Sequence, residues 1–413
     1  MRLYFHSPSF DSQLLRVASY IYFGASDLGE CLSTAARIHE NDYDSWQMEW
    51  SKLAERLMSE GIESERKGHL ISARDCFLKA SNYYRTSLYF DYRPEKKERL
   101  KEGYDLHVQA FNKASSYFAH TAEPLKIPFE GFYLPGIFYS IDKSKEVRPL
   151  IICTGGYDST HQEAYFSFVP AALQRGYNVI SFDGPGQGEL LIKKGLPMRP
   201  DWETVIRAVI DFASKRADLE LSKIALYGSS WGGFLAPRAA CFEKRIACLI
   251  ANPGQYDAMD NVRRALSQDN EGSCPEWEEF MQAAMKDKHF GNKIQTKMFI
   301  HGVETPNKLL QEWQNYTLKT IAENITCKTL VCDSENENLA PDQAKNLFDL
   351  LTCPKEYLLF KSSEGAGEHS GFGNLSLALH RIFDWLDTQY NKAQIMDELD
   401  CEKQEIISLG YIK

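Results

Sequence analysis

Residues 224–233 read Ile-Ala-Leu-Tyr-Gly-Ser-Ser-Trp-Gly-Gly, and Gly228-Ser229-Ser230-Trp231-Gly232 within them fits the pattern Gly-x-Ser-x-Gly. The apolar residues 224–227 predict a buried strand, and the small residues at 233–240 predict a helix. A serine between such elements lies on a sharp turn with an exposed hydroxyl, and the flanking glycines let strand and helix approach each other. The stretch therefore predicts a strand–turn–helix unit with Ser230 as a nucleophile.

Further apolar runs along the chain predict strands, and helical stretches such as 202–214 and 342–351 lie between most of them. The runs span residues 150–153, 178–182, 247–251, 329–332 and 357–360. This alternation is typical of the α/β class, with a mostly parallel, doubly wound sheet that has helices on both faces. Reactive groups in such sheets lie at the carboxyl ends of the strands. We therefore expect the site in the loops that follow these runs.

The first part of the chain has a different pattern. Residues 12–118 carry almost no strand signal, and their apolar residues recur at helical spacing, which predicts four to six helices. Two short strands at 127–133 and 137–141 follow, with Leu134-Pro135-Gly136 as the expected hairpin turn. We expect an all-helical N-terminal cap domain at 1–125, an α/β catalytic domain at 126–390 and a tail at 391–413. Residues 256–325 form either a lid insertion or a set of packing helices.

Composition excludes several classes of protein. The net charge of −10 argues against a general nucleic-acid binder, which needs a basic face. No apolar run reaches the roughly 18 residues of a membrane span, and the first residues lack a signal-peptide pattern. The ten cysteines are scattered singly, which indicates reduced thiols and a cytoplasmic protein without structural zinc. A small-molecule substrate is the expected partner, and the oligomeric state is open, with a homodimer as one option.

Stabilising an oxyanion beside Ser230 requires two backbone N–H groups aimed at one point. The residue after the nucleophile supplies the first, which predicts the N–H of Trp231. The second is expected from Gly155-Gly156-Tyr157, in the loop after the run at 150–153, and the candidates are the N–H groups of Gly156 and Tyr157. The alternative interpretation of this segment is an ordinary glycine turn.

The base that activates a serine is expected after the last strand, and His369 is the histidine at that place. The acid that orients this histidine is expected after the run at 329–332, where three carboxylates follow: Asp333, Glu335 and Glu337. A small residue commonly turns the chain there and the acid follows three positions later, which places Ser334 at the turn and favours Glu337.

Four motifs occur in order: Gly-Gly-Tyr-Asp-Ser-Thr at 155–160, Phe-Asp-Gly-Pro-Gly-Gln-Gly-Glu at 182–189, Gly-Ser-Ser-Trp-Gly-Gly at 228–233 and Gly-Glu-His at 367–369. With the helical segment at 72–85, they resemble a branch of the α/β-hydrolases. That branch includes 2,6-dihydroxypseudooxynicotine hydrolase, fungal pigment hydrolases that shorten a polyketide chain, and fermentation-respiration-switch esterase-like proteins. The likeness extends over nearly the whole chain.

The resemblance implies an α/β-hydrolase fold, a Ser–His–acid triad without metal or cofactor, and a helical domain that covers the active site. It also implies a role for Asp158, which matches an extra functional carboxylate of the pseudooxynicotine hydrolase, where the residue is Glu. The triad acid of the branch is usually Asp, and Glu337 is its counterpart here. From the residues alone, Asp158 is equally a loop carboxylate before a capping box of Thr160 and Glu163.

Three functions compete on this evidence. The first is cleavage of a carbon–carbon bond beside a ketone, a retro-Claisen reaction, in an aromatic or polyketide-like molecule. The second is hydrolysis of an ester or thioester, or acyl transfer, on the same triad. The third is a binding module that kept the fold and lost catalysis, and the complete set of motifs weighs against it.

Overall fold

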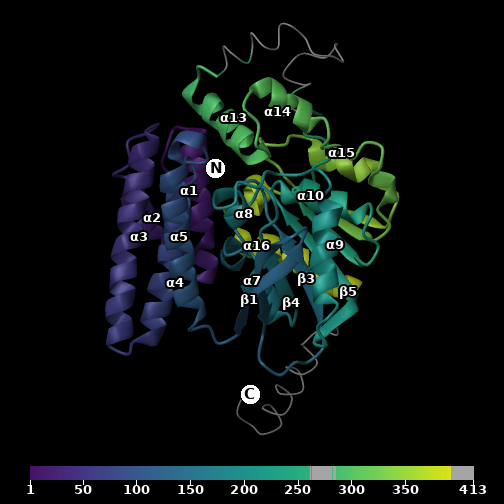
Figure 1. The fold of residues 1–413 in the computed structure, drawn as a ribbon, viewed down its shortest axis with the longest axis horizontal. Helices are drawn as coiled ribbons and strands as arrows, with labels where there is room; N and C mark the ends of the chain where they lie inside the picture. Colours follow the sequence, from purple (N-terminus) through teal and green to yellow (C-terminus); the bar gives the residue numbers. More distant parts are fainter. Residues whose placement is uncertain (261, 263–280, 282–284, 392–413) are drawn as a thin grey trace.

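The computed structural model describes residues 1–260, 262, 281 and 285–391. In Figure 1 a layer of long helices lies beside a part built around a twisted sheet. The layer comprises α1 (Pro8–Ser19), α2 (Leu28–Ala35), α3 (Tyr43–Arg66), α4 (Leu70–Ser87) and α5 (Lys97–Ser115), with short 3-10 helices at Tyr20–Phe23 and Pro94–Lys96. None of the described helices is long and apolar enough to cross a membrane.

Helix α3 shows why this region is helical. Asp42 accepts hydrogen bonds from two N–H groups of the first turn and so caps the helix. Trp46, Trp50, Leu53 and Leu57 recur at three- and four-residue spacing and are all buried. The tryptophans pack at 5.6 Å between ring centroids, inside a cluster that also draws on α1, α2 and α4. The helical pattern in the sequence therefore corresponds to an apolar face that the layer buries.

The eight strands form one sheet with the order β1-β2-β4-β3-β5-β6-β7-β8. They are β1 (Thr121–Phe129), β2 (Phe132–Ser140), β3 (Arg148–Thr154), β4 (Asn178–Phe182), β5 (Leu219–Ser229), β6 (Cys248–Asn252), β7 (Lys328–Ser334) and β8 (Lys355–Phe360). The pairs from β4 to β8 are parallel, and only β1 and β2 add antiparallel pairs at one edge. The predicted α/β sheet is confirmed.

Helices cover both faces of the sheet. The described helices of this part are α6 (Glu163–Ser167), α7 (Val169–Gln174), α8 (Gly188–Ile192), α9 (Trp202–Ala213), α10 (Gly232–Ala240), α13 (Lys288–His301), α14 (Pro306–Trp313), α15 (Gln343–Leu350) and α16 (Leu375–Gln389), with 3-10 helices at Ala322–Asn324, Ser362–Glu364 and His369–Gly371. Neighbouring residues of β3 face opposite cores: Ile152 packs with α9 and α10, and Ile151 packs with α7 and α16. This explains why the central strands are apolar throughout.

The predicted hairpin exists, but its turn lies elsewhere. Glu130 and Gly131 connect β1 to β2 with φ values of 44° and 83°, the two positive values that a tight two-residue hairpin turn requires. Pro135 and Gly136, expected in the turn, lie inside β2 instead. Pro135 pairs with Lys126 of β1, and the pairing of β2 with β4 begins at the next residue, Gly136. The prediction of a turn at Leu134-Pro135-Gly136 is therefore wrong.

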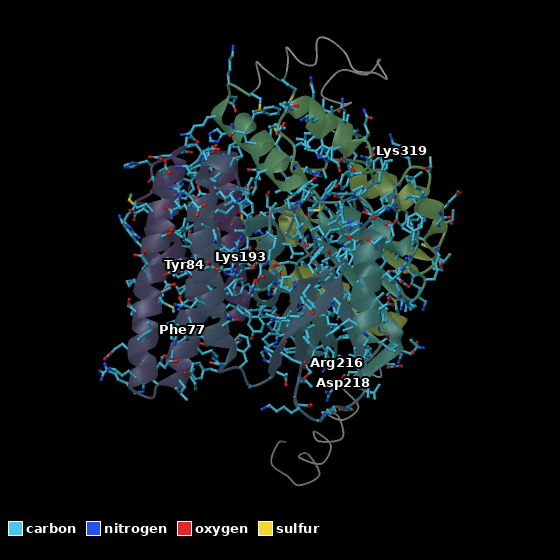
Figure 2. The ribbon with its side chains drawn as sticks, viewed as in Figure 1. Phe77, Tyr84, Lys193, Arg216, Asp218 and Lys319 are labelled. Carbon is cyan, nitrogen blue, oxygen red and sulfur yellow. The ribbon has the colours of Figure 1, made fainter. Side chains whose placement is uncertain are left out.

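The helical layer and the sheet-containing part share their cores. Tyr20 and Phe111 from the layer each lie 6.0 Å from Phe166 of α6, measured between ring centroids. At the same junction Lys193 pairs with Asp105, and Figure 2 shows Lys193 between the two parts. Helices α13 and α14 come from the segment between β6 and β7 and, in Figure 1, lie beyond the strand ends near α10. The expected lid at 256–325 falls partly, and the tail at 391–413 almost wholly, outside the described residues.

Candidate active site

The turn between β5 and α10 carries Ser230 in a strained conformation. Its φ of 57° lies in the left-handed region that a serine rarely adopts. At Gly228 the chain passes so close to the helix that a Cβ there would lie 2.0 Å from the carbonyl oxygen of Gly232. The N–H of Ser230 donates to the carbonyl of Asn252 at 2.8 Å, which ties the turn to β6. Strain of this kind persists where the surrounding structure fixes it, and here it exposes the hydroxyl.

Three side chains from separate loops form one line of hydrogen bonds. The Oγ of Ser230 lies 2.9 Å from Nε2 of His369, and Nδ1 of the same ring lies 2.6 Å from Oε2 of Glu337. Each residue follows a different strand: β5, β8 and β7 respectively. The ring can thus accept the proton of the hydroxyl on one side while the carboxylate orients it from the other.

Glu337 is held as a carboxylate despite its burial. Its side chain is 3% exposed. Burial by itself raises the pKa of this carboxyl, but the neighbouring His369 and hydrogen bonds to Oε1 from the N–H groups of Leu339 (2.9 Å) and Ala340 (3.2 Å) bring the net pKa below its ordinary value. The residue beside the imidazole is therefore ionised at neutral pH and stabilises a protonated ring.

The two rival carboxylates have other partners. Asp333 accepts hydrogen bonds from the hydroxyl of Tyr357 at 2.6 Å and the N–H of Ser334 at 2.8 Å, and burial raises its pKa. Glu335 accepts the N–H of Ser362 at 2.7 Å. Of the three candidates in this loop, Glu337 is the one that hydrogen-bonds His369.

The loop after β3 runs directly over Ser230. A Cβ on Gly156 would lie 3.0 Å from both Oγ of Ser230 and the N atom of Trp231. The N–H of Gly156 itself donates to Oγ of Ser159 at 2.9 Å and so is already engaged. Neither Trp231 N–H nor Tyr157 N–H donates to another residue in the described part of the chain. Of the two predicted second donors, Tyr157 is thus the one whose N–H is available.

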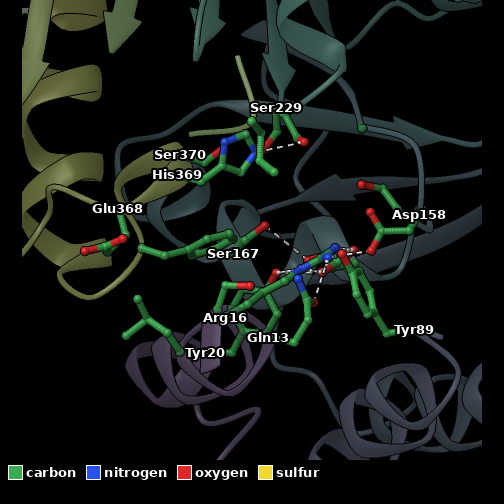
Figure 3. Close-up of a pocket in the computed structure, with 18 of the residues that line it drawn as sticks. Gln13, Arg16, Tyr20, Tyr89, Asp158, Ser167, Ser229, Glu368, His369 and Ser370 are labelled. Atoms are coloured by element: carbon green, nitrogen blue, oxygen red, sulfur yellow. Dashed lines mark hydrogen bonds and ion pairs between the residues drawn. The ribbon is translucent and has the colours of Figure 1, made fainter. Parts of the chain in front are cut away.

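Asp158 does not cap the helix that follows it. Its Oδ2 lies 2.5 Å from Nη1 of Arg16, which reaches into the cavity from α1 (Figure 3). Burial raises the pKa of Asp158. The positive charges of Arg16 and then Arg85 lower this pKa by more than burial raises it, so the net pKa is below the ordinary value. Thr160 accepts the N–H of Glu163 at 3.3 Å, as a capping box predicts. The Glu163 carboxylate, however, does not return to the loop.

Glu163 binds the helical layer instead. Its oxygens accept hydrogen bonds from Nε and Nη2 of Arg16 at 2.9 and 2.8 Å and from the hydroxyl of Tyr20 at 2.6 Å. Sequence reasoning missed Arg16, because its contact with Asp158 joins residues 142 positions apart. The one local signal is a charge inside the apolar run Leu-Leu-Arg-Val-Ala of α1. The arginine crosses from the helical layer to the site and ion-pairs with both carboxylates, and Arg85 of α4 also pairs with Glu163, at 3.3 Å.

Two cavities meet at Ser230 and His369. One, of about 540 Å³, opens toward α1 and includes Arg16, Asp158 and Glu163 in its wall. The other, of about 440 Å³, opens toward α13 and α14 and is lined mainly by aromatic and apolar side chains. A carbonyl compound with a substituent on each side can therefore place its reacting carbon at Ser230 and one substituent in each cavity. No group of three His, Cys, Asp or Glu side chains among the described residues could hold a metal ion.

Comparison with known proteins agrees with this architecture. Residues 150–352 match a family model described as the alpha/beta hydrolase family. The chain is 30% identical to the hydrolase LUC6 of a Fusarium species, over 94% of this chain and 98% of the relative. It is equally similar, at 30% over 94% and 98%, to the 20-hydroxy-prefusarin hydrolase FUS2 of Gibberella moniliformis. The chain belongs to the α/β-hydrolase family.

This α/β-hydrolase also matches a solved structure over most of its length. The crystal structure of 2,6-dihydroxy-pseudo-oxynicotine hydrolase has a TM-score of 0.72 at 19% identity, and the match covers 91% of this chain and 97% of that one. The shared fold thus includes the helical layer as well as the sheet. Membership of the family and the hydrolase names of its relatives make the chain a hydrolase, as predicted.

Proposed function

We propose that this α/β-hydrolase is a serine hydrolase that works through an acyl-enzyme on Ser230. The observation that carries the proposal is the line of hydrogen bonds from Ser230 through His369 to Glu337, at 2.9 and 2.6 Å. The N–H groups of Trp231 and Tyr157 donate to no other described residue, and the loop before Tyr157 approaches Ser230 at Gly156, which supports these two groups as the donors to an oxyanion. An inactive binding module would have no need to keep this geometry together with a strained serine.

The proposed reaction is hydrolysis of a carbon–carbon bond beside a ketone. Oγ of Ser230 attacks the carbonyl carbon as Nε2 of His369 takes the hydroxyl proton, and the N–H groups hold the oxyanion. Collapse breaks the carbon–carbon bond, leaves the acyl group on Ser230 and releases an enolate, which takes the proton from the imidazolium. Water then attacks the acyl ester with His369 as base, so the products are a carboxylic acid and a ketone.

The preference for carbon–carbon cleavage rests on the motifs and the pocket. The motifs resemble those of the branch that shortens polyketide chains, and one relative is named for 20-hydroxy-prefusarin, a small molecule. The cavity beside α13 and α14 has the aromatic and apolar lining that such molecules require. These features support a β-dicarbonyl compound with an extended apolar substituent as the substrate class.

A second candidate, ester or thioester hydrolysis, draws support from Asp158. An acid that protonates a carbon leaving group must carry a proton, whereas the ion pair with Arg16 holds Asp158 as a carboxylate. An alkoxide or thiolate leaves without such help. With the imidazolium of His369 as the one proton donor to the leaving group, the same Ser230 would favour esters.

Product analysis separates the two candidates. Benzoylacetone and p-nitrophenyl butanoate are offered to the wild-type protein and to Ser230→Ala, and the products are followed by NMR and absorbance. The proposal expects a carboxylic acid and a ketone from benzoylacetone, with neither substrate turned over by Ser230→Ala. Turnover of the ester alone would move the assignment to the second candidate, and full activity of Ser230→Ala would overturn both.

A further inference from the structure

The cavity beside α13 contains a positive charge that forms no ion pair with any of the described residues. Lys297 lines it together with Ser230 and His369. Its Nζ lies 4.1 Å from the centroid of the Tyr157 ring and 5.5 Å from that of Trp313. Across the described part of the chain, no carboxylate lies within ion-pair distance of this ammonium group. The charge is therefore held by ring faces alone.

The rings that hold Lys297 are themselves fixed. Nε2 of His301 accepts hydrogen bonds from the hydroxyl of Tyr157 at 3.1 Å and from Nε1 of Trp313 at 3.3 Å. Burial, and then the charge of Lys297, lower the pKa of His301 to about 3, so this ring is neutral and can accept both bonds. The rings of Tyr157 and Trp313 are thus held by hydrogen bonds, and neither ring carries a negative charge.

The nearby carboxylate of Asp158 already has a partner. Asp158 lines the same cavity and its charge raises the pKa of Lys297, but the two form no ion pair, and the Asp158 carboxylate is paired with Arg16 at 2.5 Å. Lys293, one helical turn before Lys297, adds a second positive charge to the same wall. A cation in a largely apolar cavity is unfavourable unless an anion or a dipole compensates it, and the two rings compensate it in part.

Lys297 nevertheless remains protonated at neutral pH. Burial and then the charge of Lys293 lower its pKa to about 8. At pH 7 that value leaves the protonated form in excess by roughly ten to one. The cavity therefore contains a cation and the reacting serine, and the one carboxylate among its described lining residues, Asp158, is already paired with Arg16.

We propose that Lys297 binds an oxyanion of the substrate, a carboxylate or the enolate of an acidic β-dicarbonyl group, while the reacting carbonyl lies at Ser230. This inference rests on the proposed serine hydrolase and narrows its substrates to acidic small molecules. The anionic oxygen would take the position between the rings of Tyr157 and Trp313, with its apolar frame against α13 and α14. A charge-assisted hydrogen bond in such surroundings contributes more than a neutral one.

Pairs of substrates that differ in one negative charge measure what that charge contributes to turnover. Two pairs of substrates test for a carboxylate. The first compares the p-nitrophenyl half-ester of glutaric acid with its neutral carbamoyl analogue, and the second compares m-carboxyphenyl butanoate with m-carbamoylphenyl butanoate. The first pair carries the charge on the acyl side and the second on the leaving side. The enolate arm is benzoylacetone against its α,α-dimethyl derivative, which cannot enolise between its carbonyls. Each ratio of kcat/KM, anionic over neutral, is measured within one protein variant, so general changes in activity cancel.

The proposal expects wild type to prefer the acidic member of at least one pair, and expects Lys297→Met to reduce that ratio by about tenfold to a hundredfold. Lys297→Arg should retain part of the preference. Lys308→Met serves as the matched control, because Lys308 is exposed on α14 and paired with Glu304, and its ratios should equal those of wild type. Preference in a carboxylate arm identifies a carboxylate, and preference only in the enolate arm identifies a β-dicarbonyl.

Thermal unfolding shows whether a lower ratio in Lys297→Met comes from a damaged fold. Because Lys297→Met removes an unpaired charge from a cavity, its Tm should equal or exceed that of wild type. Equal ratios in wild type and Lys297→Met, with turnover still dependent on Ser230, would overturn this inference and leave the serine hydrolase intact. Turnover that survives in Ser230→Ala would instead overturn the proposed function.

Discussion

Three carboxylates occur within five residues at the end of β7 and in the loop after it, and they have different partners. Glu337 hydrogen-bonds His369, whereas Asp333 and Glu335 are occupied by Tyr357 and Ser362. Glu337→Gln should lower kcat for p-nitrophenyl butanoate by about 10⁴, because the ring loses its orienting charge and its correct tautomer. Asp333→Asn and Glu335→Gln are the matched controls and should stay close to wild type. A loss in Asp333→Asn as large as in Glu337→Gln would contradict this assignment.

A second prediction for a single residue concerns Asp158. Asp158→Asn leaves Arg16 buried with one carboxylate instead of two, so the variant should lose stability by about 1–3 kcal/mol. Because the carboxylate carries no proton to donate, turnover of an ester and of a β-diketone should fall by similar factors. The measurements are the Tm and the two values of kcat/KM. A loss confined to the β-diketone, at unchanged Tm, would show that Asp158 acts on the leaving group.

Among the elements, the strands were the most predictable. The run at 178–182 coincides with β4, and the runs at 329–332 and 357–360 fall within β7 and β8. β4 and most of β7 are buried on both faces, so the sequence shows them as unbroken apolar runs, whereas β8 lies at the edge of the sheet and is only partly buried. The turn at Glu130 and Gly131 was missed because Pro135 and Gly136 are stronger turn formers, and pairing with β1 and β4 overrides that preference.

The residues of the candidate site also differ in how far the sequence predicts them. The sequence predicts Ser230 from the Gly-x-Ser-x-Gly motif, His369 from its position after the last strand and Glu337 by counting from Ser334. Arg16 and Lys297 were not found, because each acts across a gap between elements that no local pattern describes. Contacts between distant segments depend on how α1 and α13 pack over the strand ends.

Helix α5 gives a prediction that depends on pH. His107 is buried between α4 and the loop before α6, with Nδ1 at 2.8 Å from Oγ of Ser81 and Nε2 at 3.0 Å from Oγ1 of Thr160. Burial lowers its pKa to about 4, while an unfolded histidine titrates near 6.5. The unfolded chain therefore binds a proton first as the pH falls. The contribution of His107 is fully present above pH 6.5 and is lost progressively down to pH 4.

The expected size follows from linkage. Between pH 6.5 and pH 5 this one group should reduce the free energy of unfolding by roughly 2 kcal/mol. Urea unfolding at both pH values measures the change, and His107→Gln should show a smaller decrease than wild type. His120 and His301 contribute in the same direction, so the variant keeps part of the slope. An identical slope in wild type and His107→Gln would contradict the argument.

For the whole molecule, the helical layer is a structural partner of the sheet. Tyr20, Phe77 and Phe111 share one core with Phe166, and Arg16 completes the wall of the first cavity. Deletion of residues 1–120 should expose this apolar surface and leave Asp158 and Glu163 unpaired. We expect an aggregating protein without turnover, assessed by size-exclusion chromatography and esterase assay. A monomeric, fully active truncation would show that the layer is an independent module.

The most direct test of the account is covalent labelling of the proposed nucleophile. Wild-type protein is treated with a fluorophosphonate, and the mass of the intact protein and the modified peptide are determined. We expect a single adduct on Ser230, absent in Ser230→Ala and formed much more slowly in Glu337→Gln. An adduct that persists in Ser230→Ala, or a wild-type protein that turns over esters without forming any adduct, would contradict it.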